Sequence, residues 1–414
     1  MVKGAPGAEG PAKPQWAFRS RLRRGAFGWK GTKPAITRID ETLSEIRAVA
    51  RHDAALAGEG AVIFLEKLSP ALCDIDSSSG ELGNATHSAV ALVVPIIAAA
   101  PVTEAVGRKW LDRLFEALQE DDPPYIESLG DFWGDLCATP EIASSWVDRL
   151  LPTLRRVNED RKRGTFAWFK GTMACYSALF AAGRHDELLA LLESDPRPFW
   201  SCRLWGARVF AERGQVDEAI AYAESHADNY TPMGVLAEFA EELLLKAGRR
   251  GEAYDRYAIE ANQANSRLAT YRAIAKKYPE LEPDRLLGDL IASTPGDEGI
   301  WFATAKTLKR FELAAKLAWH SPCDTKTLNR AARDHLKSHS AFAAEVVIAA
   351  LYWMSMGYGY ELTGVDVREA WTYATDAATS LGDAAQIEQR IRKLLVGDSP
   401  QTVWMRTFLG SPGR

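Results

Sequence analysis

One turn-like phrase recurs in the middle of the chain at a spacing close to the length of a helical hairpin. Segments 178–194, 209–225 and 243–259 align so that Gly183, Gly214 and Gly248 are in register, each followed four residues later by a glutamate (Glu187, Glu218, Glu252). The glycines are 31 and 34 residues apart, and a weaker fourth copy at 304–321 contains Glu312. A glycine lets a helix end in a left-handed turn, and an acidic residue favours the positive end of the next helix. The period therefore predicts stacked helical hairpins.

The rest of the chain also has the apolar spacing of helices. From Lys33 onward, apolar residues recur every three or four positions, as at Ile36, Ile39 and Leu43, and no segment has a convincing strand alternation. We therefore predict an all-α protein. Together with the period, this spacing predicts an α-solenoid of antiparallel helix pairs arranged in two helical blocks.

A family resemblance rests on the pattern AxxGxxxEAxxxY, which is clearest in Ala211–Tyr222 with Gly214 one place early. This pattern resembles the helix-to-helix turn of tetratricopeptide-type repeats over about residues 165–320. The resemblance implies a superhelix. Segments 75–83 and 256–279 are also similar to uncharacterised bacterial helical-repeat proteins, some of which carry a SWIM-type zinc module. That module needs a CxC pair and a later Cys-x-His, which this chain lacks, so no zinc site is implied.

These patterns divide the chain into four expected parts. They are a basic, partly flexible arm at 1–33, an N-terminal helical block at 34–160, a tetratricopeptide-like block at 161–325 and C-terminal helices at 326–414. The arm is basic because residues 1–51 contain eleven Lys or Arg and four Asp or Glu, whereas the whole chain has a net charge of −5.

Composition favours a cytoplasmic protein without a membrane span. The five cysteines are odd in number and contain no CxxC or CxC pair, which is typical of thiols in a reducing compartment. The first sixteen residues contain no apolar stretch of the secretory type. The longest apolar run, 89–101, is too short for a span and contains Pro95, so we expect a kinked or broken core helix there.

A second repeated phrase is basic and aromatic. RRGAFGWKGT at 23–32 (the first RGxFxW phrase) recurs as KRGTFAWFKGT at 162–172 (the second RGxFxW phrase). The candidate anion- or nucleic-acid-binding residues are Arg23, Arg24, Phe27, Trp29, Lys30, Arg163, Phe166, Trp168 and Lys170. Arg and Lys would contact phosphate while Trp would stack on a base. Each phrase also directly precedes a helical block, so we favour a simpler interpretation in which its aromatic side chains cover the end of a helix stack.

Catalytic and metal-binding motifs are weak. His320, Cys323, His335 and His339 approach zinc-finger spacing, but the residues around them read as a helix end and a capped helix start, so we expect no metal. Nucleotide loops and nucleophile signatures are absent from the sequence, and we predict no cofactor and no catalytic residue. A weaker enzymatic hypothesis places an acidic pocket at loops such as 131–135 and 296–302.

Two functions follow from these expectations. The first is an interaction scaffold in the bacterial cytoplasm that binds a protein or peptide partner in the concave groove of its solenoid and is not catalytic. The alternative is a nucleic-acid-binding solenoid that uses the RGxFxW phrases, with action on a base as an open extension. The two functions make different predictions about the basic residues of the phrases. Nucleic-acid binding requires that Arg24, Lys30, Arg163 and Lys170 face one surface, whereas the scaffold does not. The oligomeric state is left open.

Overall fold

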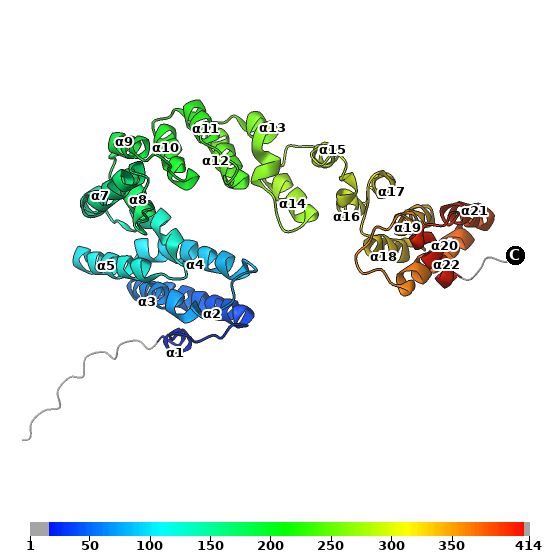
Figure 1. The fold of residues 1–414 in the computed structure, drawn as a ribbon, viewed down its shortest axis with the longest axis horizontal. Coiled ribbons are helices and arrows are strands. Elements are labelled where there is room, and N and C mark those ends of the chain that lie inside the picture. The colour runs from blue at the N-terminus through cyan, green and yellow to red at the C-terminus, as the bar shows by residue number, and fades with distance from the viewer. Residues whose placement is uncertain (1–15, 410–414) are drawn as a thin grey trace, which may run out of the picture. The chain divides into compact units, whose positions relative to one another are not determined.

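The computed structural model describes residues 16–409, and the described residues form twenty-two α-helices, two 3-10 helices and no β-strand (Figure 1). The all-α prediction is confirmed. The chain divides into two compact units, Met1–Thr231 (unit 1) and Pro232–Arg414 (unit 2).

The described helices of unit 1 are α1 (Phe18–Arg21), α2 (Thr32–Ala50), α3 (Ala54–Leu72), α4 (Glu81–Ala98), α5 (Glu104–Glu120), η1 (Glu127–Phe132), α6 (Trp133–Leu136), α7 (Pro140–Lys162), α8 (Thr172–Ala181), α9 (His185–Ser194), α10 (Trp200–Glu212) and α11 (Val216–Ser225). Those of unit 2 are α12 (Met233–Lys246), α13 (Arg250–Ala261), α14 (Arg267–Lys277), α15 (Pro283–Ala292), η2 (Glu298–Trp301), α16 (Phe302–Thr307), α17 (Phe311–His320), α18 (Thr325–His335), α19 (Ser340–Ser355), α20 (Gly364–Leu381), α21 (Ala384–Leu394) and α22 (Pro400–Leu409).

The division after Thr231 differs from the boundaries expected at residues 33, 160 and 325. The hydrophobic cores are the reason, because they continue across the expected positions. Leu154 of α7 and Leu179 of α8 belong to one core cluster of unit 1. Ala318 of α17 and Leu328 of α18 likewise belong to one core cluster of unit 2.

The described part of the expected N-terminal arm is packed on unit 1. Trp16, Phe18 and Leu22 are buried, and the Phe18 ring meets Phe64 of α3 edge-on at 6.3 Å between centroids. Gly60 of α3 has to be glycine, since a Cβ there would lie 2.2 Å from the Trp16 ring. Trp16 and Phe18 are therefore core residues, while the lead-in at 1–15 lies outside the described residues.

The turns predicted from the period are present. Gly183, Gly214 and Gly248 have φ values of 68°, 75° and 75°, and each lies between two helices. The weaker fourth copy forms the same turn between α16 and α17, but Lys309 takes the glycine position at φ 60°. The amide of the residue after the left-handed position makes the same hydrogen bond in both turns. Arg310 N donates to Ala305 O, as Gln215 N donates to Phe210 O after Gly214. Sequence reasoning missed a further turn of this type at Gly382, between α20 and α21.

Lys309 is expected to store local strain, because a left-handed conformation costs a residue with a Cβ about 1 kcal/mol. Replacing Lys309 with glycine is expected to raise the free energy of unfolding by about 0.5 kcal/mol, as the relief of strain exceeds the added chain entropy. Urea denaturation measures the change. The matched change Gly214→Ala, at the same turn position, is expected to lower stability by about 1 kcal/mol. Changes of the same sign in the free energy of unfolding of the two variants would contradict the strain assigned to Lys309.

Residues 89–98 of the apolar run belong to α4, which continues through Pro95 to Ala98, so the helix is not broken at this proline. Among the described helices, α4 alone has the length and apolar composition of a membrane span. Its residues Val90, Val93 and Ile97 are buried, and it packs against α2, α3 and α6. These contacts agree with the prediction of a core helix, and this helix positions one wall of the site described next.

Candidate functional site

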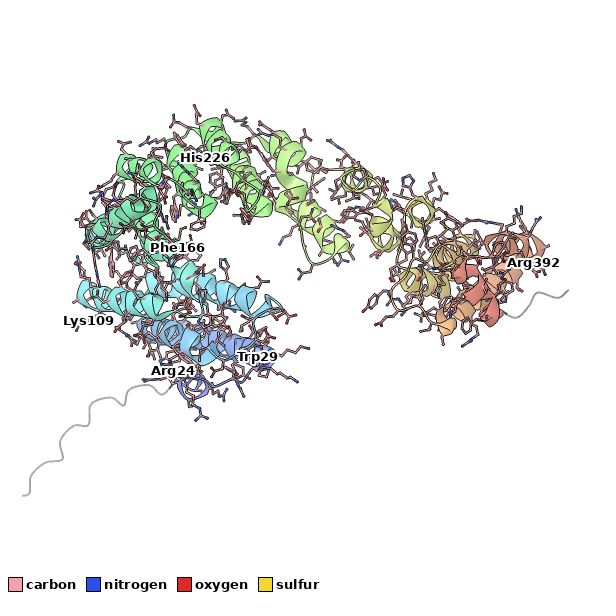
Figure 2. All side chains as sticks on the ribbon, viewed as in Figure 1. Arg24, Trp29, Lys109, Phe166, His226 and Arg392 are labelled. Carbon is pink, nitrogen blue, oxygen red and sulfur yellow. The ribbon has the colours of Figure 1, made fainter. Side chains whose placement is uncertain are left out.

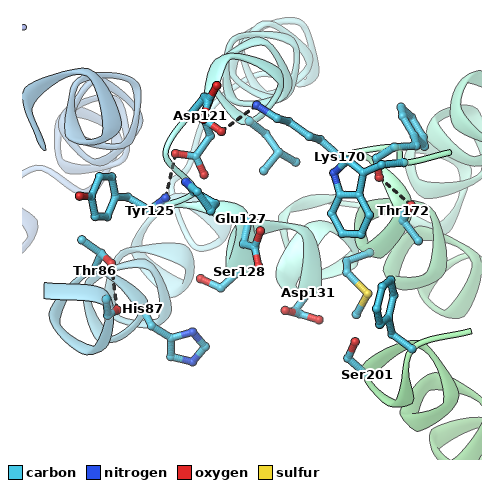
Figure 3. Close-up of a pocket in the computed structure, with 18 of the residues that line it drawn as sticks. Thr86, His87, Asp121, Tyr125, Glu127, Ser128, Asp131, Lys170, Thr172 and Ser201 are labelled. Carbon is cyan, nitrogen blue, oxygen red and sulfur yellow. Dashed lines mark hydrogen bonds between the residues drawn. The ribbon is translucent and has the colours of Figure 1, made fainter. Parts of the chain in front are cut away.

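The described part of unit 1 contains a pocket of about 780 Å³. Its walls are α4, the connection from α5 to η1, the second RGxFxW phrase and the first turns of α8 and α10 (Figure 3). We call it the η1 pocket. Its volume lies within the range of sites that hold a small molecule or a few peptide side chains.

The local conformation of the second RGxFxW phrase brings it to the pocket. Gly164 follows the end of α7 at φ 80°, and Gly171 is the N-cap of α8, where a Cβ would lie 2.4 Å from the Phe169 ring. Lys170 Nζ donates to the carbonyl oxygens of Gln119 and Asp121 at 2.8 and 2.7 Å. The end of a helix leaves carbonyl groups unpaired and attracts a cation. Lys170 thus connects the phrase to the end of α5, and binding a phosphate would compete with these bonds.

Acidic residues line the wall formed by η1 and the segment before it. Asp121 has a structural role: it is 2% exposed, and its carboxylate accepts hydrogen bonds from Tyr125 N at 3.0 Å and Ile126 N at 2.8 Å. Glu127 and Asp131 line the pocket together with Asp121. In Figure 3 these two carboxylates lie between Lys170 on one side and His87 and Ser201 on the other.

The pKa values of both pocket carboxyls are raised, although Asp131 is half-buried and Glu127 is exposed. The pKa of Asp131 is raised to about 6, because burial, with a smaller contribution from nearby Glu127, raises it more than Arg208 and His87 lower it. Burial also raises the pKa of Glu127, with the Asp121 charge adding to it and Lys170 opposing it. Among the described residues, no N–H or O–H group donates a hydrogen bond to either carboxylate. A perturbed carboxyl in a cleft is a common mark of a functional site.

Two exposed aromatic side chains belong to the pocket lining. Trp168 of the second RGxFxW phrase is 52% exposed and Phe199, the N-cap of α10, is 56% exposed. Their rings meet edge-on, with centroids 5.9 Å apart. Phe166 of the same phrase is 93% exposed but does not line the pocket. Large aromatic surfaces that remain exposed are typical of interfaces.

The pocket thiol is not an activated nucleophile. Cys202 of α10 is buried, and burial raises the pKa of its thiol to about 12. Its Sγ lies 3.6 Å from Met173 Sδ. Because nucleophilic attack needs a thiolate, Cys202 is inert at neutral pH.

The first RGxFxW phrase has a similar local conformation in a different place. Gly25 has φ 62° and Gly31 is the N-cap of α2, as Gly164 and Gly171 are in the second copy. Its backbone pairs with the last turn of α3 and with the connection that follows it, since Gly25 N donates to Pro70 O of α3 and Asp76 N donates to Trp29 O.

The two phrases do not lie together in unit 1. In Figure 2, Arg24 and Trp29 lie beside α1 and α2, whereas Phe166 lies beyond α4 and α5. The side chains of Arg23, Arg24, Trp29 and Lys30 are exposed and Phe27 is half-buried. Exposed Arg163 has Asp160 as its nearest acid, at 3.8 Å. The structure therefore brings Trp168 and Lys170 to one pocket but places the first-phrase candidates elsewhere.

The other residues that the sequence analysis considered as metal ligands or acidic-pocket residues make contacts within the fold. The described residues contain no group of three or more His, Cys, Asp or Glu that could hold a metal ion. Cys323 Sγ donates to Gly299 O, and His339 packs on the Phe311 ring at 4.1 Å between centroids. In loop 296–302, a hydrogen bond from Gly296 N lowers the pKa of Glu298. That loop belongs to unit 2, so the pocket in unit 1 takes only Asp131 from the two acidic loops.

Comparison of the chain with protein-family models, with curated proteins and with solved structures finds no match. The η1 pocket is therefore the basis for inferring function. It combines an apolar mouth with carboxylates that lack internal donors, an arrangement suited to binding a ligand that carries a positive charge.

Proposed function

We propose that the protein is a helical-repeat scaffold that binds a protein or peptide partner, and that part of the partner enters the η1 pocket. Tetratricopeptide-like helix pairs, a solenoid packing and a concave groove for the rest of the partner belong to this proposal. The observation that carries it is the exposed pair Trp168 and Phe199 at a pocket with unpaired carboxylates. Exposed aromatic anchors are enriched among the residues that dominate protein interfaces.

Cytoplasmic location is part of the same proposal. All five cysteines are free, and Cys175, Cys202 and Cys323 are buried. Unpaired buried thiols are usual in proteins of reducing compartments. A partner from the same compartment is therefore expected.

The test is selection of dodecapeptides from a random display library on the purified protein. Affinities of the selected peptides are then measured by fluorescence anisotropy. Changing both Trp168 and Phe199 to alanine is expected to weaken binding about tenfold, because loss of an aromatic anchor at an interface costs about 1–2 kcal/mol. Trp29→Ala, an exposed aromatic residue outside the pocket, is the matched control and is expected to change affinity less than twofold. Failure to select any peptide, or equal effects of the two variants, would overturn the proposal.

Nucleic-acid binding stays a second candidate because of one observation. Trp29 is 68% exposed next to the exposed side chains of Arg23, Arg24 and Lys30, a composition suited to stacking and phosphate contact. Binding of mixed RNA and DNA that weakens steeply with salt, and whose salt dependence decreases when Arg24 and Lys30 become alanine, would favour this candidate.

A further inference from the structure

We propose that the η1 pocket holds one basic side chain, an arginine or a lysine, of the partner segment. This inference rests on the proposed function and names the chemistry that the pocket recognises. It goes beyond the aromatic anchors, because it assigns the specificity to Glu127 and Asp131.

The charges of the pocket are the first argument. The acidic residues of its lining are Asp121, Asp122, Glu127 and Asp131, and Lys170 is the lysine of the lining. The Lys170 ammonium donates its hydrogen bonds to two carbonyl oxygens at the end of α5, and it donates none to Glu127 or Asp131. Half-buried Asp131 is partly removed from water without a donor, which costs free energy until a cation or donor reaches it, while exposed Glu127 adds a second negative charge. The pocket is therefore complementary to a cation.

The surroundings of Asp131 are the second argument. The charged and titratable groups that face it are His87 from α4, Arg208 and Cys202 from α10, and Glu127 on its own helix. The Arg208 guanidinium stacks on the Trp205 ring, 4.3 Å from its centroid. Burial outweighs the effects of Arg208 and His87, and the pKa of Asp131 stays raised. A ligand cation beside Asp131 would restore the ionised carboxylate.

The aromatic mouth is the third argument, and it selects a side chain over a simple metal ion. Arginine and lysine have long apolar stems that pack on aromatic rings, and their charged ends are attracted to ring faces. Trp168 and Phe199 offer such rings beside the acidic wall. The volume of about 780 Å³ leaves room for residues that flank the basic side chain.

The experiment uses the full chain and the selected dodecapeptides. Each selected peptide is resynthesised with arginine replaced by citrulline, which keeps the shape and removes the charge, or with lysine replaced by norleucine. We expect one basic residue per peptide to matter, with about a tenfold loss of affinity on its replacement. Asp131→Asn should cause a similar loss, and the two losses should not add, because both remove one ion pair. Asp135→Asn, a nearby exposed acid that does not line the pocket, is the matched control.

The pH dependence gives a second readout. Ionised Asp131 increases as pH rises through about 6, so affinity for the basic peptide should fall about tenfold from pH 7.5 to pH 5. The fall should be smaller in Asp131→Asn, in which Glu127 is the remaining pocket carboxyl with a raised pKa. It should persist in full in His87→Gln, which removes the other titratable group on the opposite wall. Selected peptides that bind equally well without a basic residue would overturn this inference and leave the proposed function standing. Failure to select any peptide would overturn the proposed function itself.

Discussion

Replacing Asp131 with asparagine is expected to make unit 1 more stable at pH 7.5. Burial raises the pKa of this carboxyl from an ordinary 3.8 to about 6, so the folded state disfavours its ionised form. A difference of that size corresponds to at most about 3 kcal/mol, with part of it lost to the solvent that still reaches the side chain. Asparagine has nearly the same shape and no charge to bury. Urea denaturation at two pH values measures the gain.

The sign of the pH dependence makes this expectation specific. Below pH 3.8 the carboxyl is protonated in both the folded and the unfolded chain, and its contribution to stability is then complete. That contribution is lost as pH rises through about 6. The gain from Asp131→Asn should therefore be full at pH 7.5 and absent at pH 3.5. The control Asp40→Asn, on the exposed face of α2, should stay within about 0.5 kcal/mol at both values.

In unit 2, replacing Glu241 with alanine is expected to lower the free energy of unfolding by about 3 kcal/mol. Glu241 of α12 is 1% exposed, and its carboxylate accepts hydrogen bonds from Tyr278 Oη, Lys277 Nζ and Asn262 Nδ2 at 2.7, 2.7 and 2.9 Å. The phenol of Tyr278 is buried, so removing its acceptor leaves a polar group without a partner.

The matched control is the adjacent Glu242, whose side chain is 60% exposed and pairs with Lys246 one helical turn away. Exposed pairs contribute less than about 1 kcal/mol, so Glu242→Ala should have a small effect. Denaturation with hydrogen exchange followed over residues 232–409 distinguishes unfolding of unit 2 from that of unit 1. Equal losses for the two variants would contradict the role assigned to the Glu241 network.

The helices and their turns were predictable because their signals are local. Gly183, Gly214 and Gly248 each lie at the turn that their spacing predicted, since a left-handed residue at a helix end is a local requirement. Lysine is rarely left-handed, so Lys309 itself does not indicate a turn. Only the repeat period suggested the fourth copy at 304–321. Gly382 was missed since no glutamate follows it at the repeated spacing.

The η1 pocket was only partly predictable. Sequence reasoning singled out Trp168, Lys170 and loop 131–135 separately, each on its own residues. Their convergence depends on helices that pack across many residues of sequence, and that packing leaves no local pattern. His87 and Phe199 had no distinguishing signal at all. The proposed boundaries differed for the same reason, because apolar periodicity predicts helices but not which cores are continuous.

The recurring left-handed turns also bear on how the chain is made. Each turn joins two helices that are close in sequence, so many contacts form between residues separated by only one hairpin. Chains with such short-range contacts fold quickly. During synthesis on the ribosome, where amino-terminal segments emerge first, the residues of unit 1 are complete before those of unit 2. The η1 pocket, which lies wholly within unit 1, can therefore form before translation ends.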